Sequence, residues 1–70
     1  MKFRVVANNY VEGTFDTLKE AIEYAENCKK EVMILGTGIS VNTINNDEWA
    51  VIGSRYNGNL SIIDKYKSLI

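Results

Sequence analysis

Apolar and polar positions follow a period of 3.6 residues between Phe15 and Lys30, which is the most regular pattern in the chain. The apolar positions are Leu18, Ala21, Ile22, Ala25 and Cys28. Charged and amide side chains fill the positions between them, so the segment predicts one amphipathic helix with one apolar face. Thr17 and Glu20 have the spacing of a capping box, in which the Thr17 hydroxyl accepts from the Glu20 amide and the Glu20 carboxylate accepts from the Thr17 amide.

Before this helix, the pattern has the period of two that is typical of strands. Phe3, Val5 and Ala7 alternate with Arg4 and Val6, so segment 2–7 predicts the first strand. The Asn-Asn pair at 8–9 tolerates positive φ, which favours a hairpin turn and a short return strand at 10–12. The alternative is a single strand followed by a loop to the helix.

After the helix, the pattern changes to short runs without a helical period. Segment 32–35 is continuously apolar, which predicts a central strand that is buried on both faces. The Gly-Thr-Gly segment 36–38 is interpreted as a hairpin turn, because it opens no helix and lacks the Lys and third Gly of phosphate-binding loops. Further strands are expected at 39–44 and 48–53, with a loop at 45–47, and the short loops make these three strands antiparallel neighbours.

The end of the chain has the least regular pattern. Segment 55–59 is turn material, and Asn59 can cap a short helix over 60–69. The apolar residues of this segment occupy more than one side of such a helix: Leu60, Ile62, Ile63, Tyr66, Leu69 and Ile70. An apolar arc of this width either packs into the sheet or covers a partner.

Together these elements predict one α+β domain over residues 1–70. We expect a small antiparallel sheet of three to five strands, with the long amphipathic helix packed on one face and the short C-terminal helix at an edge. The order is ββαβββα if segment 10–12 is a strand and βαβββα if it is not. A domain of 70 residues is close to the size at which a single core only just offsets chain entropy, so its stability margin should be small.

The composition narrows the chemistry. The chain has no His and one Cys, which excludes ordinary zinc and copper sites and Ser-His or Cys-His nucleophile pairs. We therefore expect no catalytic residues, no metal and no cofactor. Cys28 lies on the apolar face of the predicted helix and is interpreted as a structural thiol. Asp47 and Glu48 beside Trp49 are the carboxylates closest to an acid-base pair, and we interpret them as solvated loop charges.

Charge and hydropathy bear on the type of partner and on the cellular location of the protein. Eight basic and nine acidic residues give a net charge of −1, and the basic residues form no stripe that would bind a phosphate backbone. No apolar run approaches the ~20 residues that span a bilayer, and the N-terminus has no export-signal pattern. We expect a cytoplasmic protein. Eight Asn, eight Ile and six Lys suggest AT-rich codons, as in a low-GC bacterium or its phages.

The interpretation that fits these features best is a non-catalytic protein-protein interaction module, such as a small adaptor, inhibitor or regulatory subunit. Aromatic side chains and the wide apolar arc of the tail provide the candidate partner-binding residues, which are Trp49, Tyr56, Ile63, Tyr66 and Ile70. The partner is another protein or a second copy, in a homodimer formed through the C-terminal helix.

Two alternatives come from other classes. The order of one helix, three strands and a C-terminal helix resembles that of a double-stranded-RNA-binding domain, which would make the chain a nucleic-acid-binding domain. The lysine cluster of that family's last helix has no counterpart in segment 57–61, so nucleic acid is not the partner we expect. The second alternative is a small-ligand binder or enzyme, for which 70 residues leave little room for a pocket.

Overall fold

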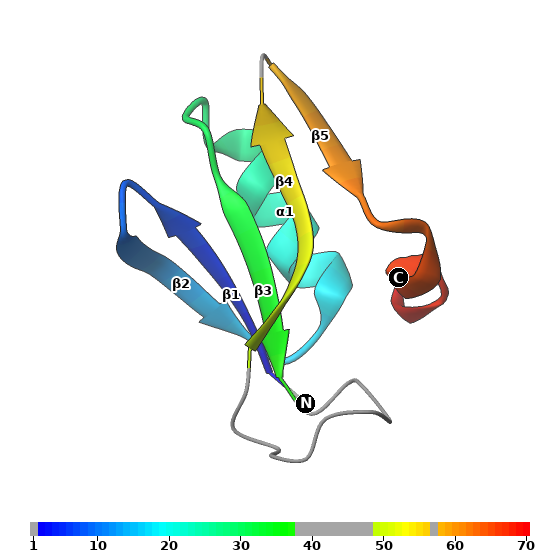
Figure 1. Ribbon diagram of the computed structural model, residues 1–70. Helices are drawn as coiled ribbons and strands as arrows, with labels where there is room; N and C mark the ends of the chain where they lie inside the picture. The colour runs from blue at the N-terminus through cyan, green and yellow to red at the C-terminus, as the bar shows by residue number, and fades with distance from the viewer. Residues whose placement is uncertain (1, 38–48, 57) are drawn as a thin grey trace.

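The computed structural model describes residues 2–37, 49–56 and 58–70 (Figure 1). These residues form strands, one α-helix and one 3-10 helix: β1 (Lys2–Ala7), β2 (Tyr10–Phe15), α1 (Leu18–Asn27), β3 (Met33–Thr37), β4 (Trp49–Tyr56), β5 (Asn59–Ile62) and the 3-10 helix η1 (Asp64–Leu69). The strands that the structure describes make one five-stranded sheet in the order β2-β1-β3-β4-β5, and every neighbouring pair is antiparallel.

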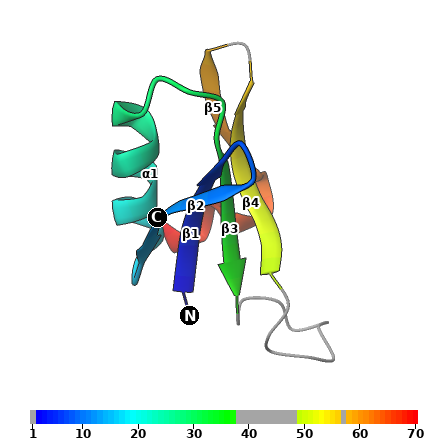
Figure 2. The same ribbon diagram turned by 90° about the vertical axis from the view of Figure 1, so that its left-hand side faces the viewer.

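Helix α1 lies against one side of this sheet, and none of the described elements covers the other side (Figure 2). The α+β class, the antiparallel sheet and the helix on one face are confirmed. The described elements occur in the order ββαβββ followed by a 3-10 helix, so the predicted C-terminal α-helix is a 3-10 helix instead. No helix in the described ranges is long and apolar enough to cross a membrane.

The core lies between α1 and the sheet. Phe3, Val5, Ile34 and Ile52 reach it from the strands, and Leu18, Ala21 and Ala25 reach it from the helix. Small alanines on the buried stripe let the helix approach the sheet closely, while the larger strand side chains fill the layer. Phe15 packs at the margin of the core and contacts the Tyr24 ring, with 5.4 Å between the two ring centres. Cys28 is half-buried at the same margin.

Helix α1 is shorter than the predicted segment 15–30. Thr17 is its N-cap, as expected, because the Thr17 hydroxyl accepts from the Glu20 amide at 3.2 Å. The second bond differs from the prediction, since the Glu20 carboxylate accepts from the Thr17 hydroxyl at 2.9 Å and not from the Thr17 amide. Phe15 pairs with Phe3 in the sheet, so the helix begins only after it.

The β1–β2 hairpin is confirmed. Asn8 and Asn9 both have positive φ, 52° and 67°, and they join the paired residues Ala7 and Tyr10 as a two-residue turn. Strand β2 continues to Phe15, beyond the expected end at residue 12, with a bulge that leaves Glu12 without a cross-strand partner in the β1 pairing.

The central position of the 32–35 strand is confirmed, since β3 lies between β1 and β4. Its expected burial on both faces is wrong, because Ile34 is fully buried while the neighbouring Met33 is 42% exposed. The expected turn at 36–38 is also wrong for Gly36 and Thr37, which pair with β1 and β4. Gly38, the strand expected at 39–44 and the loop at 45–47 lie outside the described residues.

The helix expected over 60–69 is wrong in its first half. Leu60 pairs with Arg55 and Ile62 pairs with Gly53, so this part of the chain is strand β5. Leu60 and Ile62 are two residues apart and both pack against the core, which is the spacing of a strand face. Gly58, with a φ of 87°, supplies the turn between β4 and β5. The 3-10 helix η1 then seals the core with Tyr66, which is 7% exposed.

Candidate binding surface

The side of the sheet opposite α1 carries an apolar surface built from four adjacent strands. In β1, Phe3, Val5 and Ala7 are buried toward α1, so Arg4 and Val6 point to the other side. Their cross-strand partners continue that side onto the neighbouring strands. We call this surface the open face and define it by Arg4, Val6, Val11, Met33, Leu35, Trp49 and Val51.

The register arranges these side chains in rows across the sheet. Val6 pairs with Val11 on β2 and with Met33 on β3. One row further along, Leu35 pairs with Arg4 on one side and with Val51 on the other. The apolar side chains therefore make a continuous strip that runs from β2 to β4.

Exposure separates the two sides of the sheet clearly. Val11, Met33 and Val51 are 52%, 42% and 44% exposed, whereas Ile34 and Ile52, each next in sequence to one of them, are fully buried. Val6, Leu35 and Trp49 are half-buried by their neighbours on the strip. An antiparallel sheet with one solvated face normally presents polar side chains there, so a row of Val, Met and Leu marks this face as unusual.

Arg4 and Trp49 close one end of the strip. The guanidinium carbon of Arg4 lies over the Trp49 ring, 4.1 Å from its centre. Such a cation–π contact holds a long flexible side chain in one place. Next to it, the Lys2 ammonium donates to the Asp16 carboxylate, and this hydrogen bond, together with the positive charge of Lys2, lowers the pKa of Asp16.

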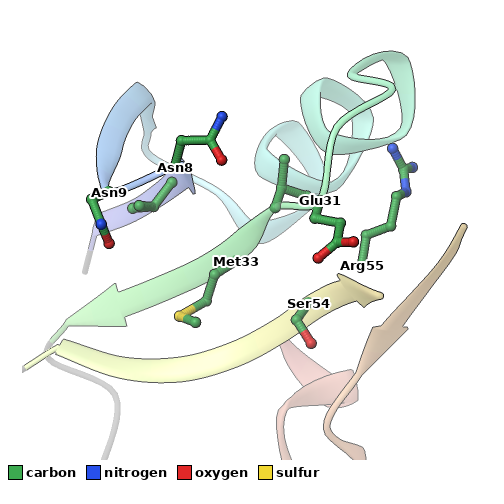
Figure 3. A pocket seen from close by; sticks show the side chains of 8 residues that line it. Asn8, Asn9, Glu31, Met33, Ser54 and Arg55 are labelled. Atoms are coloured by element: carbon green, nitrogen blue, oxygen red, sulfur yellow. The ribbon is translucent and has the colours of Figure 1, made fainter. Parts of the chain in front are cut away.

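A groove of about 430 Å³ lies at the other end of the strip (Figure 3). It shares Val6 and Met33 with the open face, and the rest of its lining is mostly polar: Asn8, Asn9, Glu31, Val32, Ser54 and Arg55. Figure 3 shows Asn8 and Asn9 on one side of the groove and Glu31, Ser54 and Arg55 on the other. The groove is open to solvent, so it extends the open face rather than enclosing a ligand.

Arg55 fixes the wall of this groove. Its guanidinium donates from Nη1 to the Cys28 carbonyl, and its amide donates to the Val32 carbonyl at 2.8 Å. These bonds tie the end of β4 to the segment between α1 and β3. Lys30 in that segment pairs with Glu12 at 2.9 Å, and the Glu12 carboxylate raises the pKa of Lys30.

The structure does not bring the five sequence-predicted binding residues together. Trp49 lies on the open face, and Tyr56 ends β4, with its side chain outside the described set. Ile63 and Ile70 flank η1 and are 44% and 61% exposed. Tyr66 is buried against the core, so within this chain its ring packs η1 and is not accessible to a partner.

Sequence reasoning missed most of the open face. The alternation in segment 2–7 already placed Arg4 and Val6 together, opposite Phe3. The unbroken apolar run at 32–35 concealed the alternation in β3, where Met33 and Leu35 face away from Ile34. Among the described residues, no group of three or more Cys, Asp or Glu side chains lies close enough together to hold a metal ion.

No protein-family model, curated protein or solved structure matches the chain. The function is therefore inferred from the surfaces of the molecule itself.

Proposed function

We propose that the chain is a non-catalytic protein-interaction module of the cytoplasm that binds a protein partner through the open face. The observation that supports this proposal is the apolar strip on the side of the sheet that no described element covers. Its members come from four adjacent strands, and three of them, Val11, Met33 and Val51, are more than two-fifths exposed. Contiguous apolar surface with a polar rim is typical of protein interfaces.

Trp49 and Arg4 add the residue types that contribute most to interface energy. Trp and Arg are enriched among the residues whose truncation weakens binding strongly. Here they are in contact with each other at the edge of the strip, so a partner that covers the strip also covers them. Of the sequence-predicted binding residues, Trp49 is the one that fits this surface.

Self-association is the second candidate. Ile63 and Ile70 are exposed apolar side chains beside η1, and they are separate from the open face. A second copy that covers them would bury both residues, in the manner expected of a homodimer formed through the C-terminal segment.

Nucleic-acid binding rests on weaker support. A sheet that presents a Trp beside an Arg can stack an unpaired base. The Trp49 ring is already covered by the Arg4 guanidinium, and the net charge of −1 does not favour a phosphate backbone. Binding of a small ligand would use the groove between Asn8 and Arg55, which is open to solvent and would leave much of a ligand uncovered.

A comparison of two matched variants tests the proposal. Val51→Lys puts a charge on the open face, and Ile70→Lys makes the same kind of change at an exposed apolar position beside η1. Each immobilised variant and the unchanged chain is exposed to a lysate of the cells that express the protein, and circular dichroism checks that each variant is folded. We expect a protein retained by the unchanged chain and by Ile70→Lys to be lost from Val51→Lys. Equal retention by all three would contradict the proposal, and loss from Ile70→Lys alone would favour the second candidate.

A further inference from the structure

Arg4 is the one charged side chain among the residues that define the open face. Lys2 lies beside it on the same strand and the same side, where its charge is paired with Asp16. Among the described carboxylates, Asp16 pairs with Lys2, Glu12 pairs with Lys30, and Asp64 pairs with Lys67. Glu20, Glu23 and Glu26 belong to α1, and Glu31 lines the groove at the end of the strip away from Arg4. No described carboxylate forms an ion pair with Arg4. The group of a partner that complements Arg4 is therefore a carboxylate.

Arg4 is held in a position that suits a carboxylate. The guanidinium carbon lies over the Trp49 ring, and the Nε of Arg4 is buried without a hydrogen-bond partner, so the terminal N–H donors are the ones that can meet a partner. A carboxylate that approaches these donors accepts two parallel hydrogen bonds, the geometry in which arginine binds acids best. Because Trp49 already restrains the side chain, less conformational entropy is lost when such a bond forms.

The size of the apolar strip matches a helix. Four strands spaced at about 4.8 Å span about 14 Å from the first to the last. A helix covers that length in about ten residues and is ~10 Å across. The opposite side of the same sheet is covered by α1, which has ten residues and buries Leu18, Ala21 and Ala25 against it (Figure 1).

We infer that the partner docks on the open face with an acidic amphipathic helix of about three turns. Its apolar stripe covers Val6, Met33, Leu35 and Val51, and one of its carboxylates binds the Arg4 guanidinium. This assignment, which rests on the proposed function, names the chemistry of the partner.

The probes for the test are two synthetic amphipathic peptides of about 15 residues, a length at which an Ala-rich helix begins to be stable. Both carry the same Leu stripe, and one has Glu beside it where the other has Lys. Each is titrated into the ¹⁵N-labelled full chain. We expect the Glu peptide to shift amides of β1, β3 and β4 and to bind at least about fivefold tighter than the Lys peptide.

Two further variants separate the charge from the fold. Arg4→Leu should bring the affinities of the two peptides together, while Lys65→Leu, which removes the cation that lies 5.0 Å from the centre of the Tyr66 ring, should leave the preference unchanged. Amide spectra of both variants show whether they remain folded. A preference for the Glu peptide that survives Arg4→Leu in a folded chain would overturn the role of Arg4.

The remaining outcomes overturn the inference without deciding the proposed function. Equal binding of both peptides to the open face would leave a protein-binding face without a requirement for acid. Absence of binding, or shifts away from the open face, would exclude this type of helix, and the Val51→Lys retention experiment would still report on the proposed function. Tighter binding of a single-stranded oligouridine to the face would replace the helix with nucleic acid. A dimer in light scattering that Val51→Lys dissociates would replace it with a second copy.

Discussion

The Arg4 guanidinium lies over the Trp49 ring, with 4.1 Å between the guanidinium carbon and the ring centre, although the two residues belong to strands that are not neighbours in the sheet. The contact crosses β3, which lies between β1 and β4. It therefore forms only when all three strands are in register, and it reports on the integrity of the open face.

Removal of this contact should have a small, measurable effect. Arg4→Met keeps a long apolar stem and loses the cation, so we expect the free energy of unfolding to fall by about 0.5–1 kcal/mol and the Trp49 emission to change. Urea unfolding followed by the fluorescence of this single Trp measures both. Lys65→Met is the matched control, since it removes a cation from Tyr66 and should leave Trp49 emission unaltered. Unchanged emission in Arg4→Met would show that the contact is absent in solution.

The two faces of β3 should differ in their contribution to stability. Ile34 is fully buried toward α1, and its neighbour Leu35 is half-buried on the open face. We expect Ile34→Ala to lower the free energy of unfolding by about 2–5 kcal/mol, and Leu35→Ala to lower it by about 1 kcal/mol. Chemical denaturation of both variants provides the comparison. Equal losses would mean that Leu35 is as much a core residue as Ile34.

Gly53 should not tolerate a side chain. A Cβ atom at this position would lie 2.5 Å from the carbonyl oxygen of Ser61 and 2.6 Å from Cδ1 of Ile62. The carbonyl belongs to the paired strand β5 and cannot move without breaking the sheet. Gly53→Ala should therefore destabilise the fold by about 1–3 kcal/mol. Ser54→Ala, at the next position, should change stability by about 0.5 kcal/mol or less. A neutral Gly53→Ala would contradict the close approach of β5 to β4.

The Lys2–Asp16 pair gives a dependence on pH with a defined sign. The hydrogen bond from Lys2, and its positive charge, lower the pKa of Asp16 in the folded chain. A lowered pKa stabilises the fold at pH values above the unfolded pKa, and this contribution is lost as the pH falls through the folded pKa. Asp16→Asn should thus be less stable than the unchanged chain at neutral pH, and the difference should vanish as the pH falls through the folded pKa of Asp16, which lies below its ordinary value of 3.8.

Urea midpoints of Asp16→Asn and of the unchanged chain, measured across that range, test this expectation. Both side chains are well exposed, so the difference should be small and should decrease with added salt. A difference that grows as the pH falls would have the wrong sign for this ion pair.

Local chemistry explains which parts of the fold could be predicted from the sequence. The period of the helix, the Thr17 cap and the Asn8-Asn9 turn depend on neighbouring residues, so the pattern contains them. The local pattern predicts a helix at Leu60 and Ile62, because their strand character comes from pairing with β4, a contact that the local sequence does not contain. The pattern predicts a turn at Gly36 for the same reason, since the strand character of Gly36 comes from its pairing with Phe3 and Ala50 on the two neighbouring strands.

The binding surface was harder to predict than the fold. Of its members, Trp49 was recognised by residue type. Met33 and Val51 were not, because an exposed apolar residue has the same sequence signature as a buried one. The side of the sheet that α1 covers decides between the two, and that choice depends on register and not on composition.

The exposure of the side-chain methyl groups in solution tests most directly whether the open face is available to a partner. A soluble nitroxide radical, added to the methyl-labelled chain, relaxes the NMR signals of methyl groups that it can reach. We expect the methyl signals of Met33 and Val51 to relax fast, because these side chains are exposed to the radical. The methyl signals of the buried Ile34 and Ile52 should be protected. Protection of Met33 and Val51 as strong as that of Ile34 would mean that this side of the sheet is covered, and the proposed binding surface would have to be abandoned.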